Sequence, residues 1–406
     1  MKITKEQARR FFLAHQRLWQ PRRLEGKAGV IDYIGKVGCI QFDPLNMVGY
    51  NPDLVLQSRV KNYQPSLLQE LLYSDRKLLD GWDKNMAIYA VEDWPYFSRY
   101  REEAHRSYGD ASSPIHEILP EVRKTLEQHG PSSSIDFKFD TKVDWAWAPT
   151  RISRAALESM YFWGELIIHH KIGTRRVYDF ANKHLPSHLL SMADPNETME
   201  QYYDWNVKRR IGAVGLLWGR PSDAWLGIKW MKSKERTEAF TRLLKNGELL
   251  TIEVEDIPHS LSIRKEEIPL LDEIDKGVDK EPQASFIAPL DNLLWDRKLI
   301  QALFGFEYTW EVYKPVSERK YGYYVLPILY GDRFVGRFEP KLDKKTKKLE
   351  IINWWWEPDV TMTDSLKQAL SSCLKAFIGY LGAKDIQLNA ACSRKNKLGW
   401  LLRMMD

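Results

Sequence analysis

The chain has 406 residues, with 60 Lys and Arg against 55 Asp and Glu, a formal net charge of +5 and 44% hydrophobic residues. This composition is typical of a folded globular protein and excludes a largely disordered one. No apolar run approaches the roughly 20 residues that a membrane-spanning helix needs, so no membrane contact is expected. Three cysteines are too few for a disulfide framework or a four-thiolate zinc site. The first residues lack the apolar core of a secretory signal, so we expect a cytoplasmic protein.

The positive charge is concentrated near the amino terminus. Residues 1–36 carry nine cations and three anions, so this segment has a net charge of +6 and the remaining chain −1. A dense basic segment favours an anionic polymer as partner. Ordinary solvated surface charge accounts for the pattern equally well, so charge alone does not identify the partner.

Residues 1–112 are expected to form a helical or winged-helix region. Thr4–Gln7 has the pattern of a capping box and predicts the start of a helix, which Pro21 stops. Further predicted elements are a helix at about Lys27–Val37, an extended segment at Cys39–Pro44, a helix at Pro65–Tyr73 and a strand at Met86–Val91.

Residues 113–190 change from a helical to a stranded period. The predicted elements are a helix at Ile118–Gln128, a short helix after Gly130, a helix at Arg151–Trp163, and a hairpin with strands at Glu165–Ile172 and Arg175–Phe180. Three helices followed by a basic hairpin indicate a winged helix.

Residues 191–282 are predicted to be a second winged helix followed by an acidic linker. Residues 196–255 contain three helical stretches, a turn at Asn246-Gly247 and an alternating strand through Leu249–Val254. Residues 256–282 are acidic and interrupted by three prolines, which is typical of a linker or of an outer excursion of the chain.

Residues 283–406 are expected to form a β-rich domain. The predicted strands are Tyr321–Tyr330, Arg333–Pro340 and Lys348–Trp356, followed by an amphipathic helix at Asp364–Leu381. The fold class predicted for the whole chain is therefore α+β.

Gln41-Phe42-Asp43 is the first candidate for chemistry. In a strand, Gln41 and Asp43 share one face and Phe42 points the other way. A carboxylate stabilises a developing cation or orients an attacking water, and a neighbouring amide holds that water. An ordinary Asp-Pro turn at the end of a strand explains the same tripeptide.

Two predicted hairpins carry candidate phosphate-binding cations. These are Arg175 and Arg176 in the first hairpin and Arg333 at the tip of Tyr330–Arg333. Exposed turn charge explains them equally well. His169-His170 lacks a nearby Cys or carboxylate cluster, and no phosphate-binding or dinucleotide-binding glycine motif is present, so we expect neither a metal nor a cofactor.

Several segments together resemble the YcaQ-type interstrand-crosslink DNA glycosylases, relatives of the azinomycin-resistance glycosylase. Gly38–Asp43 is similar to that family's glutamine–apolar–aspartate motif, and the resemblance covers nearly the whole chain. The other similar segments are Asn51–Tyr63, Ala288–Arg297, Leu303–Phe306, Arg319–Pro327 and Val335–Phe338. In one segment the chain departs from the family, which commonly has Trp-x-His-Glu where this chain reads Trp82-Asp83-Lys84-Asn85.

The resemblance implies tandem winged helices in a C-shaped arrangement and a β-domain whose hairpin approaches DNA. It implies a monofunctional glycosylase that releases N7-alkylated guanine and unhooks interstrand crosslinks. In this interpretation Asp43 stabilises the sugar cation and acts as base, and Gln41 holds the water. Double-stranded DNA is the expected partner of a monomeric, nucleoid-associated protein. The arginines expected to contact DNA are Arg59, Arg175, Arg176, Arg319, Arg333 and Arg337.

Two other functions are compatible with the predicted elements. Winged helices are mostly parts of transcription factors, so a non-catalytic DNA-binding regulator is the main alternative. A DNA-associated adaptor for other repair proteins is the second. Both would release no base from alkylated DNA.

Overall fold

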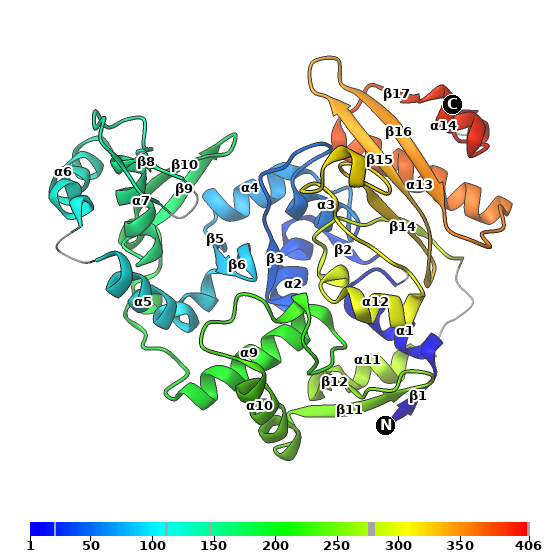
Figure 1. Cartoon of the computed structure of the whole chain (residues 1–406), viewed down its shortest axis with the longest axis horizontal. Coiled ribbons are helices and arrows are strands. Elements are labelled where there is room, and N and C mark those ends of the chain that lie inside the picture. Colours follow the sequence, from blue (N-terminus) through cyan, green and yellow to red (C-terminus); the bar gives the residue numbers. More distant parts are fainter. Residues whose placement is uncertain (20–21, 110–112, 146–147, 275–280, 404–406) are drawn as a thin grey trace. The chain divides into compact units, whose positions relative to one another are not determined.

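The computed structural model describes residues 1–19, 22–109, 113–145, 148–274 and 281–403 (Figure 1). The chain forms two compact units. The first contains residues 1–68, 82–88 and 200–406, and the second contains residues 69–81 and 89–199. None of the described helices is long and apolar enough to cross a membrane.

The first unit begins with short strands and helices that position the Gln41-Phe42-Asp43 segment. Its elements up to the second unit are β1 Lys2–Ile3, α1 Lys5–His15, β2 Leu24–Glu25, α2 Gly26–Val37, β3 Cys39–Gln41, α3 Asn51–Gln57, β4 Val60–Lys61, α4 Pro65–Tyr73, β5 Leu78–Asp83 and β6 Asn85–Ala90. Helix α4 and strands β5 and β6 each cross from one unit to the other along the chain. The short sheets formed here have the strand orders β2-β4 and β3-β6-β5.

Helix α1 confirms the predicted capping box. The Thr4 hydroxyl accepts from the Gln7 amide at 3.1 Å and the Gln7 side chain accepts from the Thr4 amide at 2.9 Å. The helix ends at His15, and Arg17 adopts a left-handed backbone with φ of 57°. The end therefore comes before Pro21, which lies outside the described residues.

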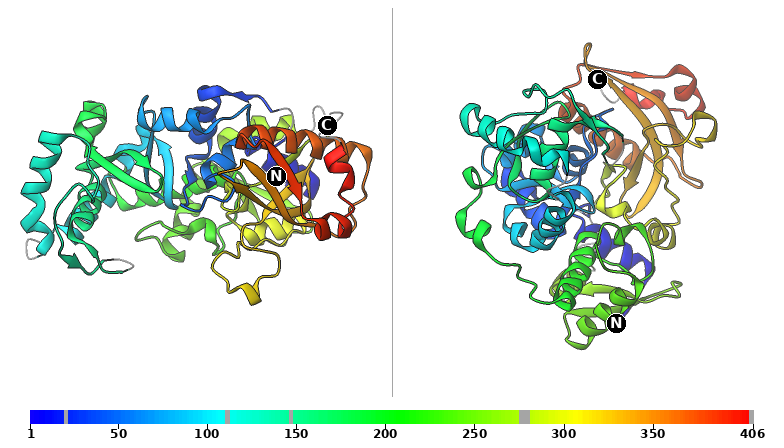
Figure 2. Two further views of the ribbon diagram at one scale, coloured as in Figure 1. Left: turned by 90° about the horizontal axis from the view of Figure 1, so that it is seen from above. Right: turned by 60° about the vertical axis from the view of Figure 1, so that its left-hand side comes forward.

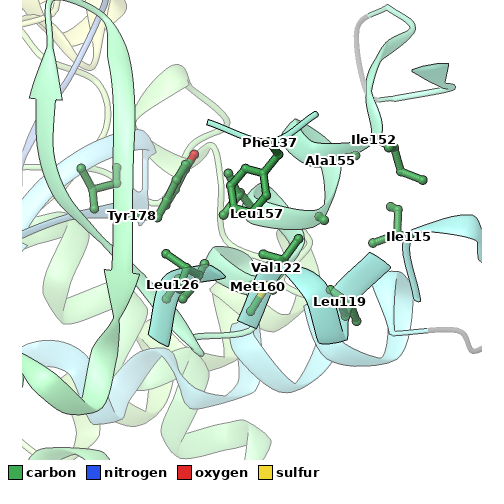
Figure 3. Close-up of a cluster of buried hydrophobic side chains, with 13 residues drawn as sticks. Ile115, Leu119, Val122, Leu126, Phe137, Ile152, Ala155, Leu157, Met160 and Tyr178 are labelled. Atoms are coloured by element: carbon green, nitrogen blue, oxygen red, sulfur yellow. The ribbon is translucent and has the colours of Figure 1, made fainter. Parts of the chain in front are cut away.

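The second unit is built around a cluster of buried side chains that come mainly from α6 and α7 (Figure 3). Its elements are η1 Val91–Phe97, α5 Ser98–Tyr108, α6 Pro114–His129, β7 Lys142–Val143, β8 Thr150–Arg151, α7 Ile152–Phe162, β9 Leu166–Ile172, β10 Arg175–Phe180, η2 Ala181–Lys183 and α8 Ser187–Ser191. The buried positions of α6 recur at helical spacing, as Ile115, Leu119, Val122 and Leu126. The predicted β9–β10 hairpin is confirmed, with antiparallel pairing from Arg175–Ile172 to Phe180–Leu166.

The short helix predicted after Gly130 is wrong. Within the described part of this segment, residues 131–145, the backbone forms turns and a bridge to β10 instead. Ser132 exchanges two backbone hydrogen bonds with Tyr178, at 2.9 and 2.8 Å, and the Asp136 carboxylate accepts from the Ser133 amide at 2.6 Å. Such local side-chain bonds to the backbone compete with helix formation.

The linker predicted at residues 256–282 is also wrong over its described part. This stretch contains β12 Leu261–Arg264, η4 Lys265–Glu267 and α11 Ile268–Glu273, and β12 pairs with β11. The preceding elements are α9 Met199–Val214, η3 Asp223–Trp225, α10 Ser233–Lys245 and β11 Leu249–Val254, the last as predicted.

Glu267 explains why this acidic stretch folds into the first unit. Its buried carboxylate accepts hydrogen bonds from Lys36 at 2.9 Å and Arg264 at 2.8 Å and lies 3.2 Å from the His15 ring. Burial alone would raise the pKa of Glu267, but His15 and Lys36 outweigh it and hold that pKa well below its usual value.

The carboxyl-terminal part contains a five-stranded sheet, as predicted for a β-rich region (Figures 1 and 2). Its strand order is β13-β14-β15-β16-β17. The elements are β13 Ala284–Phe286, η5 Asn292–Leu294, α12 Arg297–Phe304, η6 Val316–Glu318, β14 Leu326–Tyr330, β15 Arg333–Asp343, β16 Lys348–Trp356, α13 Asp364–Leu381, β17 Asp385–Leu388, α14 Ala390–Lys395 and α15 Gly399–Arg403. Helix α13 packs on this sheet through Phe377, whose ring contacts Phe286 and Phe338.

Gly49 is a glycine whose replacement is expected to destabilise the first unit. Its φ is +111°, and an added Cβ would overlap the Tyr380 hydroxyl. Gly49→Ala should therefore lower the free energy of unfolding by about 1–3 kcal/mol, as measured by urea denaturation. Gly379→Ala, on helix α13 where a methyl meets nothing within 4 Å, should not lower it. Equal stabilities of the two variants would contradict the close approach of Tyr380 to Gly49.

Candidate active site

Gln41 and Asp43 lie at the end of β3, where the extended backbone gives way to a turn. The Phe42 amide still donates to the Met86 carbonyl of β6 at 2.8 Å, but the strand itself ends at Gln41. The Asp43 carboxylate accepts from the Leu45 amide at 2.8 Å, which closes the turn. The predicted extended segment is therefore shorter than expected, and the Asp43 side chain is set by this turn.

The two side chains differ in their surroundings. Gln41 is 7% exposed, whereas Asp43 is half-buried. Desolvation raises the pKa of Asp43 above its usual value, and the bond from the Leu45 amide only partly opposes this effect. A carboxylate whose charge is incompletely solvated is a stronger base, and it stabilises a positive charge that develops next to it.

Two asparagines from distant segments fix the backbone of β3. The Asn51 amide donates to the Gln41 carbonyl at 2.8 Å, and its oxygen accepts from the Leu290 amide at 3.0 Å. The Asn292 amide donates to the Cys39 carbonyl at 2.9 Å. The segment around residues 288–297 is thus a direct support of the Gln41-Phe42-Asp43 backbone.

Lys84 approaches Gln41 from the turn between β5 and β6. Its ammonium nitrogen lies 3.4 Å from the Gln41 amide oxygen, and the residue is 5% exposed. The preceding Asp83 is buried and bridges Arg209, at 2.5 Å, and Arg210. Burial alone would raise the pKa of Asp83, but the two guanidinium groups hold it well below its usual value.

A loop between α12 and β14 presents tyrosines near Asp43; it projects in yellow in the left view of Figure 2. Tyr313 on this loop is 82% exposed. The pKa of its phenol is raised, first by partial desolvation and then by the negative charge of Asp43. The buried Glu311 carboxylate shapes the loop by accepting from the amides of Lys320 at 3.1 Å and Tyr321 at 2.9 Å. The loop therefore carries an exposed aromatic ring whose pKa responds to the charge of the candidate base.

The prediction that Arg59 contacts DNA is wrong. Arg59 is fully buried, and its guanidinium makes two bonds to Asp291, at 2.7 and 2.9 Å, and one to the Gln16 carbonyl at 2.8 Å. It also lies over the Tyr33 ring. Its role is to join α3 to the segment around Asp291.

Arg337 is a second predicted DNA contact that the structure places in the interior. Its side chain is 2% exposed and bonds Glu357 at 2.6 Å. The guanidinium also lies 4.3 Å from the centre of the Phe306 ring and 4.1 Å from that of Tyr321. Since every face of this group is occupied by protein, phosphate contact is not available to it.

The four remaining arginines stay candidates for DNA contact. Arg333 in the first unit and Arg175 in the second are exposed. Arg319 is half-buried and donates to the Lys314 carbonyl at 2.9 Å. Arg176 is half-buried, 3.8 Å from Glu158.

Sequence reasoning missed the groups that hold the site together. Asn51 and Asn292 lie inside the family-like segments, so their position in those segments was the available signal. Lys84 was visible only as a departure from the family motif. The partnership of Asp83 with Arg209 and Arg210 joins residues more than 120 positions apart and left no local signal.

The sequence also raised His169-His170 as a possible metal-binding pair. Within the described ranges, no group of three or more His, Cys, Asp or Glu side chains is placed to hold a metal ion. His169 and His170 do meet, with their Nδ1 atoms 2.8 Å apart. The pairing of β9 with β10 shifts at this point, so the two rings do not point in opposite directions as they would in a regular strand.

Comparisons with known proteins agree on one family. A family model described as DNA glycosylase AlkZ-like matches residues 34–380, which include Gln41, Asp43 and Lys84. The solved structure of the Streptomyces sahachiroi DNA glycosylase AlkZ is similar over 96% of this chain and 100% of its own, with 15% identical residues and a TM-score of 0.61. At this identity the likeness shows the fold, and the mixture of helices and strands is consistent with the predicted α+β class.

Proposed function

Because the chain belongs to the AlkZ-like DNA glycosylase family, we propose that it hydrolyses the N-glycosidic bond of N7-alkylated guanine in duplex DNA. The proposal includes guanines that are crosslinked to the opposite strand. The observation that carries it is the half-buried Asp43, whose pKa is raised by desolvation, at the end of a strand whose Gln41 is buried and fixed by Asn51.

The chemistry of the proposed substrate matches these two groups. An N7-alkylated guanine is cationic and leaves without protonation, so no strong general acid is needed. The remaining tasks are to stabilise an oxocarbenium-like sugar and to deliver water to C1′. Asp43 would perform the first task and accept the proton of the water, which Gln41 would hold. Because water is the nucleophile, the enzyme would be monofunctional.

Crosslinked bases constrain how the DNA is bound. Most glycosylases extrude a base into a closed pocket, which a base tethered to the other strand cannot enter. In our proposal residues 113–190 and residues 191–282 each form a winged helix that contacts DNA on an open surface, and the β9–β10 hairpin is the wing of the first. The protein would act as a monomer in the cytoplasm, associated with the nucleoid when DNA is bound.

Base release from alkylated DNA tests this function directly. The protein is incubated with duplex DNA containing N7-methylguanine, and the abasic product is cleaved with alkali. Strand breaks only after alkali support a monofunctional glycosylase, and breaks without alkali would contradict that mechanism. Absence of any base release would contradict the proposed function. It would favour the alternative of a DNA-binding regulator or of an adaptor, neither of which the comparisons support. A second duplex with one crosslink tests unhooking.

Removal of an exposed arginine should change the salt dependence of DNA binding. The logarithm of the DNA association constant falls linearly with the logarithm of the salt concentration, and each lost phosphate contact makes this slope less steep by about 0.9. We expect Arg175→Ala and Arg333→Ala each to show this loss in a salt titration monitored by fluorescence anisotropy. Arg106→Ala, another exposed arginine whose partner is Glu103 at 2.9 Å, should keep the full slope. An unchanged slope in Arg175→Ala would remove that residue from the proposed interface.

A further inference from the structure

Lys84 is a buried amine that contacts Gln41 and Trp295. The residue is 5% exposed, its nitrogen lies 3.4 Å from the Gln41 amide oxygen, and it lies 4.9 Å from the centre of the Trp295 ring. A buried ammonium needs such partners, because its charge is otherwise strongly destabilised. Gln41 supplies a hydrogen-bond acceptor and Trp295 supplies the negative face of an aromatic ring.

The turn that carries Lys84 is held firmly on both sides. Asp83 is anchored by Arg209 and Arg210, and the following Asn85 has a left-handed backbone with φ of 60°. Gly227 packs so closely on this turn that an added Cβ would meet the Asp83 carbonyl at 2.5 Å. The position of the Lys84 backbone is therefore determined by contacts other than the one with the Gln41 side chain.

The pKa of Lys84 lies below the usual value for a lysine. Desolvation by burial, followed by the charge of Arg210, lowers its pKa to about 8. Arg297 acts in the same direction, and Asp223 and Cys39 oppose it. An amine with this pKa is largely protonated below pH 8 and becomes a neutral group, able to accept a hydrogen bond, above it.

We propose that Lys84 is a positioning residue that selects one orientation of the Gln41 side-chain amide. The ammonium group has only donors, so it binds the amide oxygen and leaves the amide NH2 free to donate outward. An attacking water can accept a hydrogen bond from this NH2 and donate one to Asp43. Its remaining lone pair is then free to attack C1′, and its proton points to the carboxylate that accepts it. A neutral amine also accepts from an NH2 group, so the amide can flip and the orientation is lost. This inference rests on the proposed function.

The kinetic test compares Lys84→Met and Lys84→Arg with the wild type. Loss of a hydrogen bond to a charged group should lower kcat for N7-methylguanine release about tenfold to hundredfold in Lys84→Met, with KM unchanged. The wild-type rate should fall as pH rises through about 8, and this limb should be absent in Lys84→Met. Lys84→Arg, which keeps its charge, should restore most of the rate and extend it to higher pH.

A matched control and a stability measurement exclude simpler explanations. Lys234→Met removes an exposed lysine, whose side chain is 80% exposed, and should leave kcat and its pH profile unchanged. Lys84→Met should stay folded at the assay temperature, because the loss of one hydrogen bond to the Gln41 amide is offset by removal of a buried charge. A full rate in Lys84→Met, or loss of rate that tracks unfolding, would overturn the proposal.

A direct measurement separates this proposal from the function on which it rests. The Gln41 side-chain amide signal, assigned by its loss in Gln41→Glu, is followed by NMR in isotope-labelled protein without DNA. It should shift with a midpoint near pH 8 in the wild type and stay constant in Lys84→Met. A flat titration in the wild type overturns the role of Lys84 whether or not the protein releases bases. Borohydride trapping of a wild-type protein–DNA adduct would also overturn it, since the amine would then attack C1′ itself.

Discussion

Replacing Asp43 with asparagine should lower the rate of N7-methylguanine release by more than about a hundredfold while leaving the protein folded. Asparagine has nearly the same shape and keeps an oxygen that can accept from the Leu45 amide, but it cannot take a proton from water or stabilise a cation. The measurement is a single-turnover rate on methylated duplex DNA. A rate within threefold of the wild type would remove Asp43 from the mechanism.

The pH dependence of the wild-type rate and the stability of Asp43→Asn supply independent checks. Desolvation raises the pKa of Asp43 in the folded protein. The wild-type rate should therefore begin to fall at a higher pH than the usual pKa of an aspartate would give, because the protonated carboxyl is inactive. Because folding favours the protonated form of this carboxyl, the ionised form is a stability cost at neutral pH. Asp43→Asn should therefore be at least as stable as the wild type at pH 7. Asp32→Asn, at a half-exposed carboxylate 3.1 Å from Arg17, is the control and should keep full activity.

Replacing Arg59 with methionine should be the most destabilising of these substitutions, at about 3–5 kcal/mol. The guanidinium and the Asp291 carboxylate are both completely buried and bond each other at 2.7 Å. Removal of the cation leaves a buried carboxylate without its partner. Urea denaturation measures this loss, with activity falling only as far as the folded fraction falls.

A second substitution distinguishes a structural role of Arg59 from one in DNA binding. Arg59→Met combined with Asp291→Asn removes the stranded charge and keeps an oxygen that can accept from the Leu293 amide, as Asp291 does at 2.9 Å. The double variant should recover part of the lost stability, and its DNA affinity per folded molecule should equal that of the wild type. Weaker binding by fully folded double variant would mean that Arg59 does act on DNA.

Local sequence patterns predicted those elements whose cause is local. The capping box of α1 follows from four adjacent residues, and α13 follows from an apolar stripe at helical spacing. Strand β11 at Leu249–Val254 follows from the alternation of Leu250, Ile252 and Val254 with polar residues. In each case the residues that determine the element lie within it.

The predictions that failed depend on partners far away in the sequence. Arg59 and Arg337 look like solvent-exposed cations until Asp291 and Glu357 are placed beside them. The acidic stretch around Glu267 resembles a linker until Lys36 neutralises it. In the candidate site, Gln41 and Asp43 were predicted from a motif, but Lys84 acquires a role only through a contact across 43 positions.

The contacts that hold the candidate site come from distant parts of the sequence, so we expect the site to form late during protein synthesis. Strand β1 pairs with Glu253 and Val254, and the backbone of β3 is bound by Asn292, which a ribosome reaches after most of the chain has emerged. Contacts of such sequence separation form late. A polypeptide released early by a stalled ribosome would thus carry Gln41 and Asp43 but lack the groups that hold them in place. Incomplete translation products are therefore expected to lack an ordered Gln41–Asp43 segment.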